Sequence, residues 1–238
     1  MKKSFKKLLM LLAVITLSMI MPITVKAAKF NASDVAVLKK IAKTQNATGA
    51  KIPDADSPTS APCYDWMEIN GEYRVVTIRW ENLGITGKVS FSGLSELEDL
   101  WCSDNSITKI DVSKNKKLTR IFASNNKITS LNLTNNPNLT EVTCENNQLK
   151  YINVTKCKKL EDLNCAGNKL ESLNITKNKN LEILDCKNNK LEKLNITKCP
   201  KLGLLVCNKN KIQKLNATAC PDIDIECDKS VEIIESQE

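Results

Sequence analysis

A 21-residue repeat governs the middle of this 238-residue chain. The aligned units share the pattern LxxLxCxxNxLxxLxIxxNxx, which is clearest in residues 160–180. The first position of the units is Leu97, Leu118, Leu139, Leu160, Leu181 and Leu202. The ninth position is Asn105, Asn126, Asn147, Asn168, Asn189 and Asn210. Six units in one phase leave no room for coincidence, so the chain has to fold as stacked copies of one small unit.

Each unit predicts one coil of a solenoid. The alternating apolar residues of the L-x-C segment predict a short strand whose apolar side chains point inward. The asparagine at the ninth position is expected to turn the chain and to hydrogen-bond backbone groups that the turn leaves unpaired. So short a unit has little room for a helix on its outer side, so its second half should be extended or a short 3₁₀ turn. Because one coil cannot enclose a core, stacked coils must share one.

This pattern is that of a leucine-rich repeat. Residues 97–222 resemble the J-type internalins of Gram-positive bacteria, because a short unit, a cysteine in the strand and a Leu-x-Val/Ile-Ser/Thr-x-Asn half occur together. The fold expected is an α/β leucine-rich-repeat solenoid, right-handed, with a parallel concave β-sheet, a largely extended or 3₁₀ convex side and a small helical N-terminal cap. The resemblance also implies a surface protein that engages partners through its repeat domain.

Four segments are expected along the chain. Residues 1–27 resemble a secretory signal peptide, with a basic start, an apolar run and a small-residue cleavage site. Residues 28–74 should form an N-terminal cap, in which Ser33 is a candidate N-cap for a short helix with Val35, Leu38 and Ile41 on one face. Residues 75–222 comprise one 22-residue and six 21-residue units, and residues 223–238 form a C-terminal cap.

The net charge of +8 depends strongly on the predicted signal. The signal holds five of the 35 basic residues and no acidic one, so 30 basic residues face 27 acidic ones in the remainder, a net charge of +3. We therefore expect an exported protein without a membrane span after signal removal, secreted or loosely associated with the cell surface. No cell-wall sorting motif follows the repeats, and we expect a monomer.

The chain has ten cysteines and no histidine. Without histidine there is no Ser-His-Asp or Cys-His catalysis and no histidine-ligated metal, and no CxxC pair is present, so we expect neither a metal nor a cofactor. Most cysteines fall in two columns of the repeat and should be reduced and buried. For Cys63 and Cys227, the sequence makes no prediction of the redox state. The sixth-position column is Cys102, Cys144, Cys165, Cys186 and Cys207, and the nineteenth-position column includes Cys157, Cys199 and Cys220.

The third and fifth positions of each strand should face outward on the concave side. Trp101 and Phe122 lie side by side there and are candidate anchors for a protein ligand, although they could instead cover the junction with the N-terminal cap. Ile183 and Leu204, near the C-terminal end of the repeats, form a second and weaker candidate apolar area. The predicted concave site comprises Asp99, Trp101, Arg120, Phe122, Glu141, Thr143, Asp162, Asn164, Ile183, Asp185, Leu204 and Val206.

The flank and convex side carry a strong positive charge. Positions ten to twenty-one of the six units hold 18 lysines and only four acidic residues. This excess has two interpretations: a solvated surface, or a surface that adsorbs an anionic polymer such as wall teichoic acid or a glycosaminoglycan. Aromatic residues make up only 4% of the chain, too few for a base-stacking surface, so no specific nucleic acid is expected.

The sequence therefore predicts an exported, non-enzymatic protein-binding module, internalin-like by resemblance and suited to adhesion or host interaction. The alternative is binding of a carbohydrate or an anionic cell-wall polymer. An enzyme is disfavoured: Glu141 and Asp162 could pair as in a glycosidase, but a shallow open surface should not shift the pKa of a carboxyl group. No catalytic residue is assigned.

Overall fold

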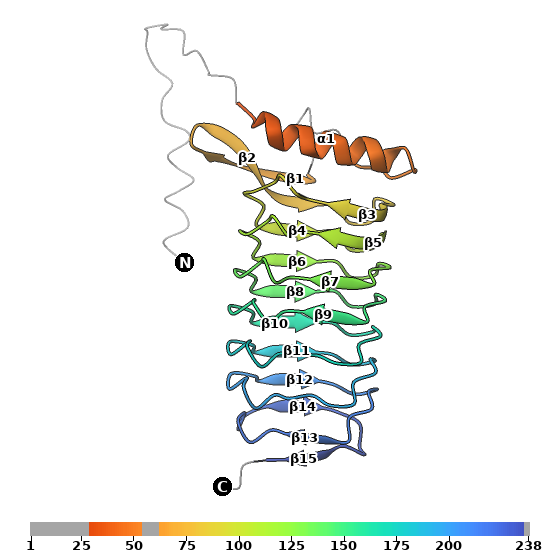
Figure 1. Ribbon diagram of the computed structural model, residues 1–238, viewed down its shortest axis with the longest axis vertical. Helices are drawn as coiled ribbons and strands as arrows, with labels where there is room; N and C mark the ends of the chain where they lie inside the picture. The colour runs from red at the N-terminus through yellow and green to blue at the C-terminus, as the bar shows by residue number, and fades with distance from the viewer. Residues whose placement is uncertain (1–28, 54–61, 236–238) are drawn as a thin grey trace, which may run out of the picture.

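The computed structural model describes residues 29–53 and 62–235, which form one stack of coils with a helix across its N-terminal end (Figure 1). The predicted signal at residues 1–27 lies outside this part of the chain. No helix in the described residues is long and apolar enough to cross a membrane. The elements are α1 (Ala32–Asn46), β1 (Tyr64–Ile69), β2 (Glu72–Arg79), β3 (Thr86–Ser90), β4 (Asp99–Trp101), β5 (Ser106–Asp111), β6 (Arg120–Phe122), β7 (Ser130–Asn132), β8 (Glu141–Thr143), β9 (Tyr151–Asn153), β10 (Asp162–Asn164), β11 (Ile183–Asp185), β12 (Leu204–Val206), β13 (Lys214–Asn216), β14 (Asp224–Glu226) and β15 (Glu232–Ile234).

The main sheet has nine strands in the order β1-β2-β4-β6-β8-β10-β11-β12-β14. The β1–β2 pair is antiparallel, and every other pair is parallel. Between β4 and β12 each strand pairs with the next at an offset of one repeat unit, as Leu100 with Ile121 and Ile121 with Val142. The repeat period therefore sets the register, and the predicted leucine-rich-repeat solenoid with a parallel sheet and a small helical cap is confirmed.

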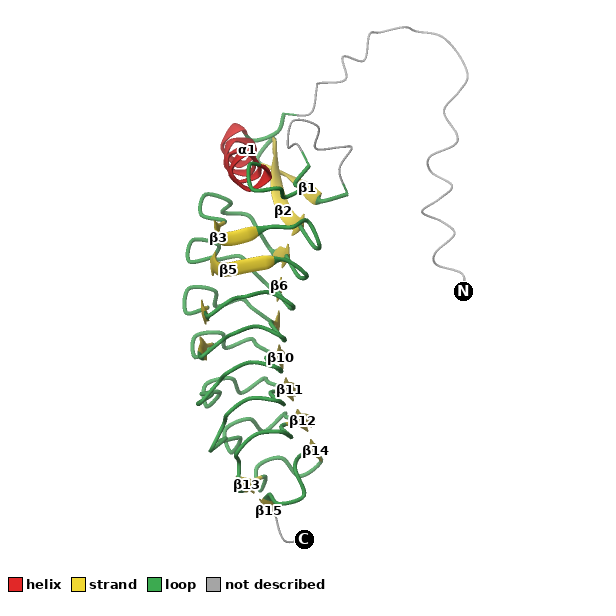
Figure 2. Cartoon of the chain, turned by 90° about the vertical axis from the view of Figure 1, so that its right-hand side faces the viewer, coloured by secondary structure: helices red, strands yellow, loops and turns green. Residues whose placement is uncertain are grey.

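The opposite side of the stack is built from extended segments and turns (Figure 2). Three two-stranded sheets, β3–β5, β7–β9 and β13–β15, lie there. The turns that lead back to the main sheet are closed by short-range hydrogen bonds, such as Asn115 N to Val112 O at 3.0 Å and Leu118 N to Asn115 O at 3.2 Å. These bonds join residues three apart, so in the described residues the second half of the unit combines extended segments with short turns, as predicted.

The core runs the length of the stack as columns of like residues. The first-position leucines and the fourth-position aliphatic residues are buried, and so are Trp80 and Phe91 at the N-terminal end. All ten cysteines are free in this structure, and eight of them are buried, which confirms the predicted burial of the two cysteine columns. Cys63 and Cys227 are half-buried. In an apolar column a thiol acts as a small hydrophobic group.

The ninth-position asparagines join each coil to the one before it. The Nδ2 group of Asn147 donates to Ala123 O in the preceding coil at 2.9 Å and to Cys144 O in its own coil at 3.1 Å. Its Oδ1 atom accepts the Ile128 N–H at 2.9 Å. The equivalent side chains from Asn105 to Asn210 make the same contacts. This is the backbone pairing that the sequence predicted for these side chains.

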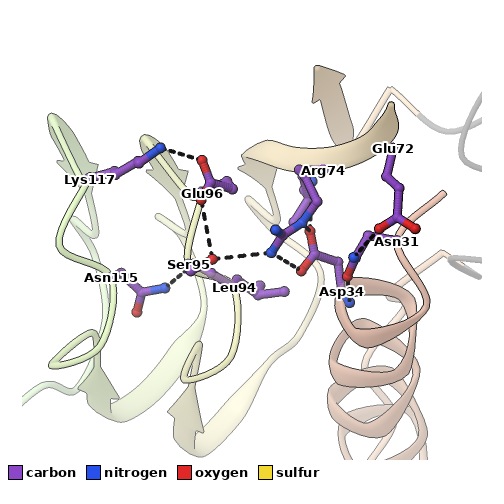
Figure 3. Close-up of polar contacts among 10 residues, drawn as sticks. Asn31, Asp34, Glu72, Arg74, Leu94, Ser95, Glu96, Asn115 and Lys117 are labelled. Carbon is purple, nitrogen blue, oxygen red and sulfur yellow. Dashed lines mark hydrogen bonds and ion pairs between the residues drawn. The ribbon is translucent and has the colours of Figure 1, made fainter. Parts of the chain in front are cut away.

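The N-terminal cap consists of α1 and the β1–β2 hairpin. The helix begins earlier than predicted, because the side chain of Asn31, not Ser33, caps it by accepting the Asp34 N–H at 3.1 Å. The Asp34 carboxylate is fully buried and accepts two hydrogen bonds from Arg74, at 2.8 and 2.9 Å (Figure 3). A buried carboxylate needs such a partner, so this ion pair holds α1 on the hairpin.

A hydrogen-bonded chain extends from this ion pair into the repeats. Arg74 also donates to Ser95 Oγ at 3.1 Å, Ser95 contacts Glu96, and Glu96 forms an ion pair with Lys117 of the next coil (Figure 3). The cap and the first coils are thereby connected through side chains as well as through the core.

The C-terminal end of the stack is one residue out of phase. Strand β14 pairs with β12 so that Leu205 faces Ile225, whereas the repeat period would place residue 226 there. The following segment returns as β15, which pairs with β13. Residues 223–235 thus form a further short coil, and this register places Cys227 next after Cys207 in the sixth-position column.

Candidate binding surface

The concave surface is formed by the third- and fifth-position side chains of β4, β6, β8, β10, β11 and β12. These strands pair in register, so like positions of neighbouring coils lie side by side at about 4.8 Å. The structure thus brings the twelve predicted residues into two adjacent columns. The third-position column is Asp99, Arg120, Glu141, Asp162, Ile183 and Leu204, and the fifth-position column is Trp101, Phe122, Thr143, Asn164, Asp185 and Val206.

Trp101 and Phe122 form a stacked aromatic pair. Their ring centroids lie 4.1 Å apart with an interplanar angle of 30°, and both side chains are half-buried. The aromatic rings of the cap pack among themselves, with Tyr64 contacting both Trp66 and Trp80. Among the described residues the Trp101–Phe122 pair makes no ring contact with this cluster, whereas Trp101 lies beside Arg79 of β2.

The charged side chains beside the aromatic pair are fixed by ion pairs. Arg120 contacts Asp99 through two hydrogen bonds, from Nε to Oδ1 at 2.8 Å and from Nη2 to Oδ2 at 2.6 Å. Arg79, which faces Trp101 across the strand pair, donates to Asp65 of the hairpin at 2.8 Å. These two-point contacts limit the rotamers of both arginines, so this end of the surface is rigid before any ligand arrives.

Glu141 and Asp162 are neighbours in the third-position column, and neither forms an ion pair within the described residues. Burial raises the pKa of Glu141, and the negative charge of Asp162 raises it further. Burial likewise raises the pKa of Asp162, with a further contribution from Asp185. The expectation that an open surface leaves these pKa values unshifted was therefore wrong, because the packing of side chains in adjacent columns desolvates the carboxylates.

The C-terminal part of the surface is more apolar. Ile183 is 40% exposed and Leu204 is half-buried, so both are accessible. Val206 is only 8% exposed, which differs from the expectation of an outward-facing residue. Asp185 forms an ion pair with Lys187 at 3.0 Å, and Asn164 donates to Glu145 at 3.1 Å. Because it is nearly buried, Val206 adds little accessible area to the concave surface.

The sequence prediction missed the contribution of the β1–β2 hairpin to this surface. Asp65 and Arg79 extend the charged columns beyond β4, because β2 is itself the first coil strand. The signal for Arg79 was available, since it holds the fifth position of the 22-residue unit. Asp65 carried no such signal, because it lies outside the repeats.

Across residues 29–53 and 62–235, no group of three or more cysteine or acidic side chains is placed to hold a metal ion. The concave surface offers two-point charged contacts and a stacked apolar pair, which suits recognition of a macromolecule by shape and charge.

These features define a leucine-rich-repeat solenoid, and solved structures with the same fold include several internalins. The functional domain of InlJ from Listeria monocytogenes, which includes a cysteine ladder, is 28% identical with a TM-score of 0.59, and the match covers 63% of this chain and 34% of that domain. The internalin InlF from Listeria monocytogenes is 26% identical with a TM-score of 0.53, and the match covers 62% and 48% of the two chains. The chain thus spans less than two thirds of either internalin.

A plant protein shares the fold at a lower identity. The repeat ectodomain of the receptor kinase SOBIR1 from Arabidopsis thaliana is 19% identical with a TM-score of 0.53, and the match covers 84% of this chain and 98% of that one. No protein-family model matches the chain, and no curated protein matches it significantly. The chain is internalin-like in its fold and its 21-residue cysteine-bearing repeat, as the sequence predicted, and this likeness supports a protein-binding kind of fold.

Proposed function

We propose that the concave surface binds a protein ligand and that the chain is an exported, non-enzymatic adhesion or host-interaction module. The observation that carries the proposal is the stacked Trp101–Phe122 pair, half-buried on a rigid strand array beside the Asp99–Arg120 ion pair. Aromatic side chains in fixed surroundings bind with a small loss of conformational entropy. Export rests on the predicted signal at residues 1–27 and on the resemblance to internalins.

The ligand should be a folded protein with an apolar patch beside basic groups. The aromatic pair would occupy the patch, and the carboxylates of Glu141 and Asp162, which form no ion pair within the described residues, would face the basic groups. Ile183 and Leu204 provide a second apolar area two coils beyond Glu141. A monomer suffices for this arrangement, because one chain supplies all the residues involved.

The test compares the wild-type protein with a Trp101→Ala/Phe122→Ala variant in capture of extracellular and host-surface proteins. Loss of both rings should weaken binding of the specific ligand by at least about 30-fold, since the loss of even one central aromatic anchor costs roughly 2 kcal/mol. Tyr151→Ala is the matched control, because Tyr151 is 53% exposed in β9 on the opposite side of the stack. Urea unfolding of all three proteins checks that folding is intact.

Capture that is unchanged by the double substitution, or equally reduced by Tyr151→Ala, contradicts the proposal. The same three proteins on a glycan array test the alternative, a carbohydrate or wall-polymer ligand for the concave surface: glycan binding that requires both rings would favour it. Fractionation of producing cells into medium, wall and membrane tests export and surface association.

A further inference from the structure

A separate hollow of about 340 Å³ lies on the flank of the stack, between two coils. It is lined by Thr155, Lys156 and Lys158 from the turn after β9 and by Asn174 and Lys177 from the coil that contains β10. The three lysines are exposed, and none of them forms an ion pair with a carboxylate in the described part of the chain. The hollow therefore holds three uncompensated positive charges.

The remaining polar groups of the hollow also favour an anion. The Oδ1 atom of Asn174 accepts the Thr176 N–H at 3.2 Å and the Thr176 hydroxyl at 2.8 Å. These bonds fix the orientation of the amide and leave its Nδ2 group, a donor, without a partner among the described residues. No carboxylate lines the hollow, whereas the hollow at Lys187 and Lys209 also includes Glu145. Ammonium and amide donors without an acidic neighbour suit a tetrahedral oxyanion.

The same residue types recur one coil further along the stack. One repeat unit after the five lining residues stand, in the same order, Thr176, Lys177, Lys179, Asn195 and Lys198. The Asn195 amide is held in the same way, since its Oδ1 atom accepts the Thr197 N–H at 3.1 Å and the Thr197 hydroxyl at 2.8 Å. Two equivalent donor sets thus succeed each other at the coil spacing of about 4.8 Å. The pattern stops one unit later, where Pro200 and Ala219 replace the corresponding lysines.

We propose that this lysine flank, residues Lys156, Lys158, Lys177, Lys179 and Lys198 with their intervening amides, binds a linear carbohydrate polymer that carries sulfate or phosphate groups. The polymer would run along the stack, with successive oxyanions held by successive coils. Lysines without arginine or aromatic side chains in the lining favour oxyanions on a sugar chain over nucleic acid, whose bases would require stacking partners. The inference does not depend on the concave protein-binding surface, from which the flank is separate.

The experiment measures binding of three polymers to the folded protein: heparin for sulfate, a glycerol-phosphate teichoic acid for phosphate, and single-stranded DNA for nucleic acid. The test variant is Lys156→Gln/Lys158→Gln/Lys177→Gln. We expect it to bind heparin or the teichoic acid at least about 10-fold more weakly at about 50 mM salt, and the wild-type affinity to fall as salt rises. Whichever of the two polymers binds more tightly identifies the oxyanion.

The control variant is Lys127→Gln/Lys169→Gln/Lys190→Gln, which removes the same charge from exposed tenth-position lysines on the opposite flank. It should lose less than about 3-fold in affinity. Trp101→Ala/Phe122→Ala should leave polymer binding unchanged, which separates this site from the concave surface. Three results overturn the inference: no polymer binding by the wild-type protein, equal losses in the two lysine variants, or tighter binding of single-stranded DNA than of either other polymer.

Discussion

At the scale of single residues, asparagine recurs at three positions of the repeat unit with three different tasks: it fills the ninth position in all six 21-residue units, the fifteenth in five and the eighth in three. At the ninth position it pairs backbone groups of adjacent coils. At the fifteenth position its Oδ1 atom accepts the N–H of the threonine two residues later, as Asn153 does from Thr155 at 3.2 Å. This turn gives a structural reason for the recurring Asn-x-Thr triplets, which match glycosylation sequons in sequence.

The third task falls at the eighth position, which has its own backbone requirement. Its residues adopt positive φ angles, such as 53° at Asn125 and 62° at Gly167, a conformation that asparagine, aspartate and glycine adopt most readily. Asn125 and Asn146 are also linked by a side-chain hydrogen bond of 2.9 Å. Asparagine, aspartate or glycine at this turn therefore meets a requirement of the backbone conformation.

Replacing a ninth-position asparagine should be costly. Asn147→Ala leaves the Ile128 N–H and three backbone carbonyls without their side-chain partner inside the stack. We expect a loss of roughly 3 kcal/mol in the free energy of unfolding, measured with urea. The control Gln148→Ala alters the exposed neighbour and should change stability by less than about 0.5 kcal/mol. Similar effects of the two substitutions would contradict this account.

At the scale of the strand, in-register parallel pairing places like positions together. The arrangement is favourable where Asp99 meets Arg120, and unfavourable where Glu141 meets Asp162. Because burial and charge raise the pKa of both carboxyl groups in the folded protein, they bind protons more tightly there than in the unfolded chain. Their contribution to stability is therefore most favourable at low pH and is lost as the pH rises through the folded-state pKa values.

Asp162→Asn should relieve this conflict. Removing the neighbouring charge should lower the pKa of Glu141 towards its ordinary value, which NMR titration of the side-chain carboxyl would measure. The variant should be more stable than the wild-type protein at about pH 7 and nearly equal to it at about pH 3, where Asp162 is protonated. An unchanged Glu141 pKa would show that burial alone sets its value. Asp224→Asn, at an exposed strand position outside this acidic group, serves as the control.

At the scale of the whole molecule, each coil depends on its neighbours for burial. The sixth-position column passes from Trp80 at the cap through the cysteines to Cys207 and is almost completely shielded from solvent. Burial raises the pKa of the Cys102 and Cys144 thiols to about 12, so these thiols are unreactive while the stack is intact. The cysteines thus act as core residues that report on the integrity of the solenoid.

Thiol labelling without reduction tests this view. In the native protein only Cys63 and Cys227, which are half-buried, should react quickly with an alkylating reagent. In denaturant at least eight of the ten cysteines should be labelled, as counted by mass spectrometry. Detection of four or five disulfides would contradict the description of the cysteines as free core residues.

How much the sequence revealed depends on the range of the contacts. Repeat period, strand register, the two cysteine columns and the asparagine pairing were predictable, because each arises between neighbouring coils and recurs in every repeat unit. The aromatic pair was predictable for the same reason. The N-cap of α1 at Asn31 was not predictable, because the N-terminal cap occurs once and no second copy confirms its pattern.

By itself, then, the sequence determined the coil and the columns, since a periodic chain with nearest-neighbour contacts has essentially one way to stack. Only the tertiary structure decided the features that require several coils or distant segments at once. These are the Asp34–Arg74 ion pair between α1 and the hairpin, the near burial of Val206, the raised pKa values of Glu141 and Asp162, and the hollow at Lys156 and Lys177. Their physical cause is desolvation and side-chain packing in three dimensions, which a one-dimensional pattern does not contain.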